Sequence, residues 1–284
     1  MQRILGILLL FWVGLTGVSR AGERLLIFAG AASRPPTEEA ARAFERKTGV
    51  RVDLVFGGSG YVLSQMILSR KGDLYFPGSS DYMELAKRKK AVFPETERIV
   101  AYLVPAIIVK KGNPKGIHSL RDLLKPGIRV AIANPEGVCV GVYAVEILER
   151  ALRPAEKAAF RQKLTNYTGS CAQTAAAVSL GAVDAVIGWR IFAYWDPKHL
   201  EAIPLRPEEV VRVGYMPIAV ARFTRNRPLA EAFIRFITSP EGKDIFRRYH
   251  YFMSPEEAFS FIGARKPVGG TYKVPAEWLG GRTR

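Results

Sequence analysis

Short apolar runs alternate with amphipathic segments along the chain. Residues 25–29 are apolar, and residues 37–47 carry apolar side chains at helical spacing. A β-branched run at 50–56 is followed by a second amphipathic segment at 61–70. This alternation of strands and helices predicts an α/β protein in which the sheets are mostly parallel and are covered by helices.

The alternation continues in two separate sets of units. A third strand and helix at 73–90 complete the first set, and a second set lies between residues 119 and 188. Two long apolar segments, 99–109 and 213–221, separate these sets from each other and from the helices that end the chain. We interpret the two segments as crossovers, so the sequence predicts two lobes of which the first is discontinuous.

The N-terminus has the pattern of an export signal. Arg3 precedes an apolar stretch, and the small residues Ser19 and Ala21 frame a cleavage site. The stretch is about 15 residues long, whereas a membrane span needs roughly 20, so an uncleaved anchor is the weaker alternative. The expected organisation is a signal peptide at 1–21, lobe 1 at 22–104 and 214–262, lobe 2 at 105–213, and a basic C-terminal tail at 263–284.

Composition and charge narrow the class of protein. A hydrophobic content of 48% excludes a disordered chain. The formal net charge of +16 favours an anionic partner, but the basic residues are dispersed and export argues against nucleic acid. The charge therefore favours small anions, and the export signal predicts a periplasmic location.

Motifs for catalysis and metal binding are missing from the sequence. His118, His199 and His250 are far apart, and none has a second histidine at metal-ligand spacing. The segment 57–61 lacks the final glycine of a nucleophile elbow, and no phosphate-loop pattern occurs. We therefore predict neither a metal site nor an enzyme.

Two serines offer hydrogen-bond donors instead. Ser33 and Ser59 each follow an apolar strand and precede a helix, where ligands of open α/β sheets bind. The free N–H groups of a helix's first turn favour anions. A serine at such a position is also a good helix N-cap, which is the alternative for each alone. Two such loops rich in glycine and alanine favour an anion site.

Five motifs in order resemble those of a known family. They are residues 28–33, 56–60, 72–76, 134–144 and 181–189. Together they are similar to the periplasmic molybdate/tungstate-binding proteins, and residues 239–246 are similar to the last helix of many solute-binding proteins. The resemblance implies a two-lobed type II periplasmic-binding fold, a monomer that closes on a tetrahedral oxyanion, no cofactor, and an ABC transporter permease in the inner membrane as partner.

The resemblance also implies the residues of the site. Ser33 and Ser59 would bind the anion, molybdate or tungstate, from the first lobe. Val140 and Cys171 match positions that donate backbone N–H groups from the second lobe. Trp189 stands where the family commonly has a tyrosine, and its larger indole can still donate a hydrogen bond. Such neutral donors replace the hydrogen bonds that the anion loses with water.

Cys139 and Cys171 are the two cysteines of the chain, and they map onto the same wall of this cleft. In an exported protein such a pair predicts a disulfide. Closing a loop of about 33 residues would stabilise the lobe by roughly 3–4 kcal/mol. The alternatives are thiolates that bind a soft metal or metalloid species, which would then be the solute, or two unpaired packing cysteines. A periplasmic thiol enzyme is a further alternative that requires a base beside one thiol.

Overall fold

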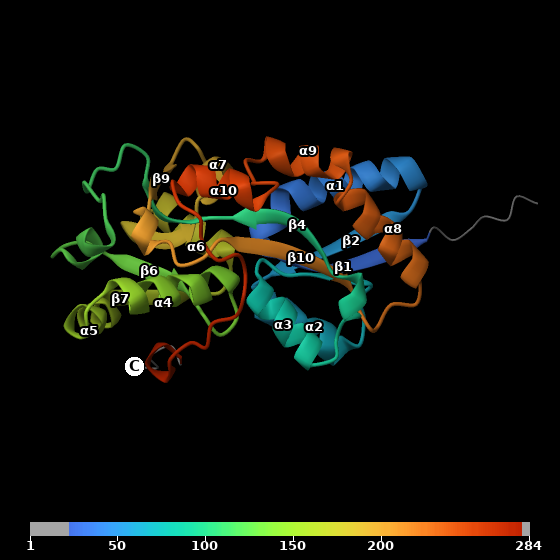
Figure 1. Ribbon diagram of the computed structural model, residues 1–284, viewed down its shortest axis with the longest axis horizontal. Helices are drawn as coiled ribbons and strands as arrows, with labels where there is room; N and C mark the ends of the chain where they lie inside the picture. The colour runs from blue at the N-terminus through green and yellow to red at the C-terminus, as the bar shows by residue number, and fades with distance from the viewer. Residues whose placement is uncertain (1–22, 280–284) are drawn as a thin grey trace, which may run out of the picture.

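Two five-stranded sheets organise the computed structural model of the protein, which describes residues 23–279 (Figure 1). The expected signal peptide and residues 280–284 of the expected tail lie outside the described residues. Within residues 23–279, no helix combines the length and the apolar character needed to cross a membrane.

The first sheet has the strand order β2-β1-β3-β10-β4. Its strands are β1 (Arg24–Gly30), β2 (Arg51–Gly57), β3 (Leu74–Phe76), β4 (Arg98–Leu103) and β10 (Gly214–Val220). Strand β1 pairs in parallel with β2 and β3, whereas β10 is antiparallel to both of its neighbours. Four of the five strands therefore run in one direction.

The second sheet repeats this plan with the order β7-β6-β8-β5-β9. Its strands are β5 (Pro105–Lys110), β6 (Val130–Ala133), β7 (Leu164–Thr168), β8 (Ala185–Trp189) and β9 (Leu200–Pro204). Here β5 is the single opposing strand, because it is antiparallel to β8 and β9 while β6 is parallel to β7 and β8. The prediction of mostly parallel sheets is confirmed.

Helices cover the sheets of both lobes. They are α1 (Arg34–Thr48), α2 (Ser59–Ser69), α3 (Ser80–Arg88), α4 (Cys139–Ala151), α5 (Pro154–Lys163), α6 (Cys171–Ser179), α7 (Phe192–Trp195), α8 (Arg227–Ile237), α9 (Pro240–Arg248) and α10 (Pro255–Ile262). In the first lobe, α2 and α3 lie on one side of the sheet and α1, α8 and α9 on the other (Figure 1). The buried apolar cluster beneath α2 and α3 lies within the first lobe, whereas the cluster beneath α1, α8 and α9 continues into the second lobe.

Two crossovers connect the sheets, as predicted. Strand β4 continues into β5 through Val104 alone, within the predicted segment 99–109. The chain returns through residues 205–213, which is earlier than the predicted 213–221. Most of that apolar segment is β10 itself, which is apolar because it is buried inside the first sheet.

The sequence pattern did not indicate strands β7 and β9. Both are edge strands with exposed or half-buried side chains, so the apolar alternation that marks a strand is weak in them. Residues 120–124, at the start of the second set of units, form a 3-10 helix.

The described part of the expected tail, residues 263–279, packs against both lobes. Val268 forms an isolated β-bridge with Val213 of the second crossover. The Ser80 hydroxyl of α3 donates to the Gly270 carbonyl over 2.6 Å. Trp278 is buried in the apolar cluster of the second lobe. This segment is therefore a strap across the lobes rather than a separate basic extension.

Candidate functional site

Four of the predicted site residues lie where helices begin at the cleft between the lobes. Ser33 and Ser59 lie at the starts of α1 and α2, and Val140 and Cys171 at the starts of α4 and α6. Each is at most 1% exposed. The segment Ala31–Ser33 contacts α6, so loops of opposite lobes meet here.

The two serines differ in what their hydroxyls do. Ser33 Oγ donates to the Gly30 carbonyl over 3.1 Å, so an anion would have to attract this hydroxyl away. Ser59 Oγ accepts a hydrogen bond of 3.0 Å from the Gly78 amide, so its own proton is not used in that bond and can be donated to Cys139 or to a ligand. Neither hydroxyl caps a helix, so the capping alternative is wrong for both.

Direct hydrogen bonds hold the lobes together around these loops. The Gly60 amide donates to the Gly137 carbonyl over 2.8 Å, and the Tyr82 hydroxyl donates to the Pro135 carbonyl over 3.0 Å. Gly58 allows this approach, since a Cβ there would lie 2.7 Å from the Gly137 oxygen. The structure is therefore a closed form of the cleft.

The two cysteines lie side by side in the closed cleft. Cys139 and Cys171 are the first residues of α4 and α6, and their Sγ atoms are 3.7 Å apart. They are not bonded here, so the disulfide stays a prediction. Burial disfavours a thiolate, but the nearby donors of Cys171, Trp189, Ser59 and the Val140 amide lower the pKa of Cys139. Burial and the neighbouring Cys139 raise the pKa of Cys171.

Trp189 ends strand β8 and is completely buried. Its Nε1 makes no hydrogen bond of good geometry within residues 23–279, although it faces the Cys139 sulfur closely enough to affect its pKa. Gly214 makes room for the indole, because a Cβ there would lie 2.9 Å from the tip of the ring. The larger side chain thus fits where the resemblance implied a tyrosine, and its N–H is available to a ligand.

Some residues around the site were not predicted. Gly78 and Ser79 follow β3, and the buried Ser79 hydroxyl has no partner among the described residues. The rule that ligands bind after strand ends applies to β3 too and would have pointed to them. Tyr251 donates to the Ala32 carbonyl and lies near both cysteines. It lies between α9 and α10, and no local pattern indicates its place.

A buried ion triad that the sequence did not reveal links the lobes beside the cleft. Arg212 of the second crossover contacts Asp81 of α3 over 2.9 Å and Glu146 of α4 over 2.7 Å. All three side chains are less than 10% exposed. Burial acts to lower the pKa of Arg212, but Tyr143 and Asp81 raise it overall, so the guanidinium is charged.

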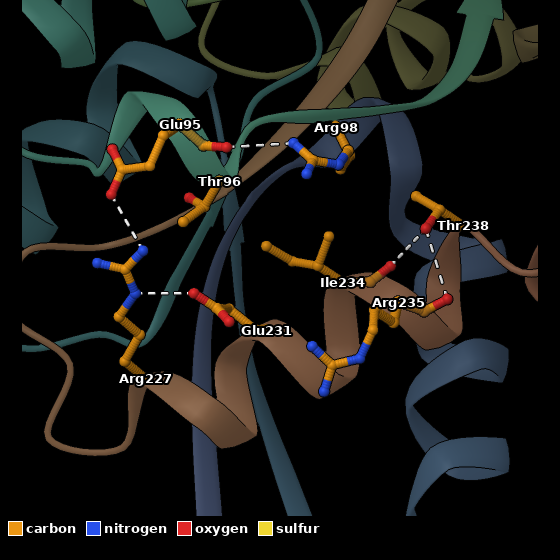
Figure 2. A pocket seen from close by; sticks show the side chains of 8 residues that line it. All are labelled: Glu95, Thr96, Arg98, Arg227, Glu231, Ile234, Arg235 and Thr238. Carbon is orange, nitrogen blue, oxygen red and sulfur yellow. Dashed lines mark hydrogen bonds and ion pairs between the residues drawn. The ribbon is translucent and has the colours of Figure 1, made fainter.

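A hollow of ≈ 240 Å³ lies elsewhere, on the surface of the first lobe (Figure 2). It is lined by Glu95, Thr96, Arg98, Arg227, Glu231, Ile234, Arg235 and Thr238. Arg227 bonds to Glu95 over 3.0 Å and to Glu231 over 2.7 Å, so its charge is already paired. The ion pairs of this hollow are exposed to solvent, and the hollow belongs to one lobe only. It is therefore not the candidate site.

Metal ligands do not gather at either place. Within residues 23–279, no three histidine, cysteine, aspartate or glutamate side chains are grouped so that they could hold a metal ion. The cleft instead contains two thiols and neutral N–H and O–H donors. That set suits an anion, or an ion that accepts two sulfur ligands.

Comparisons with known proteins agree with this geometry. The chain is 24% identical over 245 residues to the molybdate-binding protein ModA of Escherichia coli, covering 80% of this chain and 88% of that protein. It is also 24% identical over 275 residues to the sulfate-binding protein of Escherichia coli, covering 87% of this chain and 84% of that protein.

The fold is also similar to solved structures. The sulfate-binding protein SubI of Mycobacterium tuberculosis superposes with a TM-score of 0.73 at 18% identity, covering 87% of this chain and 93% of that one. The two-lobed fold and the resemblance to periplasmic molybdate-binding proteins are confirmed. Residues 25–252 match the bacterial extracellular solute-binding proteins, and the chain belongs to that family.

Proposed function

We propose that the protein captures a tetrahedral oxyanion, most specifically molybdate or tungstate, between its lobes. The observation that carries this proposal is the buried Trp189 N–H, which lacks a hydrogen bond of good geometry among the described residues and lies beside Cys139, where Ser59, Val140 and Cys171 also meet. An unsatisfied buried donor costs about 1–3 kcal/mol, so its retention suggests a ligand that accepts from it.

Neutral donors are sufficient to hold such an anion. The Ser59 hydroxyl and the Trp189 indole supply two side-chain donors. The first turns of α4 and α6 add N–H groups and the positive ends of their helix dipoles. Hydrogen bonds to a charged acceptor are about twice as strong as neutral ones, which offsets the loss of the anion's hydration. In a closed cleft, water does not compete for these donors.

The choice among oxyanions depends on the distance between the hydrogen-bond donors, which must match the size of the anion. Sulfate and molybdate share shape and charge, and proteins named for each are among the relatives. A site whose donors are spaced for the larger anion leaves some of them unpaired around the smaller one. We assign molybdate or tungstate because of the five ordered motifs, and sulfate is the alternative that a comparative titration separates.

The biological setting belongs to the same proposal. The expected export signal and the extracellular family support a periplasmic location, where the closed monomer would deliver its anion to an ABC transporter permease. A thiol enzyme is less consistent with the site. The groups that act on the pKa of Cys139 are a thiol, an indole, a hydroxyl and an amide, and none of these is a general base.

Calorimetric titration of the reduced protein with molybdate, tungstate, sulfate and phosphate tests the proposal. Trp189→Phe keeps an aromatic ring and removes the N–H, so molybdate affinity should fall about 10-fold or more, as for a lost hydrogen bond to a charged group. Trp278→Phe is the matched control. It removes an indole hydrogen bond to Glu149, which lies near the end of α4 opposite Cys139, and should leave affinity unchanged. Absence of heat with every oxyanion, or equal affinity of Trp189→Phe and wild type, would contradict the proposal.

A further inference from the structure

The paired thiols give the cleft a chemistry that oxyanion binding does not use. Cys139 and Cys171 both belong to the second lobe, where their helices α4 and α6 pack on the same sheet. Their separation therefore does not depend on whether the lobes are open or closed. Both cysteines are 1% exposed in the closed form, and an approaching ion would reach them through the opened cleft.

We propose that the reduced Cys139–Cys171 pair binds one thiophilic monovalent metal ion, of the class that Cu(I) represents. Two sulfurs 2.3 Å from one ion lie about 3.8 Å apart at the tetrahedral angle and about 4.6 Å apart in a linear arrangement. The observed 3.7 Å already fits the bent arrangement. Small rotations of the two side chains, which separate the sulfurs by up to about 1 Å, would reach the linear one.

The charge of the complex favours a monovalent ion. Two S–H bonds are replaced by two metal–sulfur bonds, two protons leave, and Cu(I) with two thiolates carries a net charge of −1. Ser59, Trp189 and the Val140 amide all direct donors at the Cys139 sulfur, and none of these groups is charged. They stabilise a buried monoanion as they would an oxyanion. Although Trp189 Nε1 lies near this sulfur, it makes no hydrogen bond of good geometry within residues 23–279, and this is the second observation that points to a ligand here.

A divalent ion fits the site less well. Two thiolates would give it a neutral complex, which gains less from the surrounding donors. Zinc in proteins usually takes three or four protein ligands, and residues 23–279 supply no third histidine, cysteine, aspartate or glutamate within reach. Sulfur ligands select soft ions such as Cu(I). The inference shares the cleft with the proposed function, but it rests on the two sulfurs and stands or falls separately.

Anaerobic competition with a chromogenic Cu(I) chelator tests the inference on the full reduced protein. We expect one Cu(I) per chain, with sulfur-to-copper charge-transfer absorption in the near ultraviolet. Cys139→Ser and Cys171→Ser should each weaken binding at least 100-fold, and Trp189→Phe should weaken it less. Met83→Leu removes a buried sulfur from the first lobe and should change nothing. Circular dichroism establishes that each variant is folded, and Cys→Ala variants replace any that are not.

Two outcomes would overturn the inference: no Cu(I) uptake by the reduced protein, or uptake that persists in both cysteine variants. Molybdate titration of the same samples distinguishes this failure from failure of the proposed function. Molybdate binding without Cu(I) binding refutes the metal site alone. Cu(I) binding without a response to any oxyanion, in wild type and in the cysteine variants, refutes the oxyanion function alone. If both bind, each should exclude the other, since they use the same donors.

Discussion

Replacement of Arg212 by methionine should strongly destabilise the closed protein. The guanidinium is the single partner that Asp81 and Glu146 share across the two lobes. Methionine keeps an apolar stem of similar length, but it leaves two buried carboxylates without their common counter-charge. The backbone carbonyls of Gly269 and Gly270 in the C-terminal strap also lose a donor.

The structure sets the size of this effect. Removing one partner of a buried ion pair costs about 3–5 kcal/mol. Glu146 keeps Arg150 at 3.0 Å, and Asp81 keeps the Tyr272 amide at 2.9 Å, so the lower end applies. A loss of about 3 kcal/mol in the free energy of unfolding corresponds to a decrease in Tm of roughly 6–12 °C for a chain of this size.

Thermal and urea denaturation of the ligand-free protein would measure this loss. Arg227→Met is the matched control, because Arg227 also bridges two acids, Glu95 and Glu231, but at the surface. Exposed pairs contribute about 1 kcal/mol or less. Replacing Asp81 and Glu146 by Asn and Gln in the Arg212→Met background should recover part of the loss. Equal stability of Arg212→Met and wild type, or an equal loss in Arg227→Met, would refute this account of the triad.

Two further predictions concern closure and pH. Gly58→Ala fits the backbone but places a Cβ 2.7–2.8 Å from two carbonyl oxygens of the second lobe. Molybdate should then fail to compact the protein in small-angle X-ray scattering, whereas Gly57→Ala, which meets Val62 of its own lobe, should still compact. Lys125 lowers the pKa of Asp122 in the folded protein to about 2, whereas its unfolded pKa is near 4. The ionised Asp122 therefore stabilises the folded state at pH values above about 4, and this contribution is lost as the pH falls through about 2. Asp122→Asn should therefore cost about 1 kcal/mol at pH 7, allowing for solvent screening, and less at pH 2–3 in urea denaturation; an equal cost at both pH values would contradict this reasoning.

The sequence predicted those strands whose side chains are buried along most of the strand. Strand β1 and the crossover into β5 are buried along most of their length, so their apolar runs are recognisable. Edge strands such as β7 have no such run, and the pairing that forms them comes from a neighbour distant in sequence. The strap at 263–279 was missed for the same reason, because its partners are Ser80, Val213 and Asp81.

The site was predictable to the extent that it depends on chain direction. Ligand loops follow parallel strands, a rule that indicates Ser33 and Ser59, and the ordered motifs add the starts of α4 and α6. Contacts set by lobe packing were not predictable. Tyr251 and Arg212 reach the cleft region from segments far along the chain, and no local pattern marks either of them. The distance between the two sulfurs depends on how α4 and α6 pack, which no local pattern specifies either.

A crystal structure of the reduced protein with molybdate, using the anomalous signal of molybdenum, tests the central claim most directly. The account predicts one strong anomalous peak between the lobes, with molybdate oxygens within hydrogen-bond distance of Ser59 Oγ, Trp189 Nε1 and the amides that begin α4 and α6. A cleft without such a peak, or a peak only in the surface hollow beside Arg227, would contradict it.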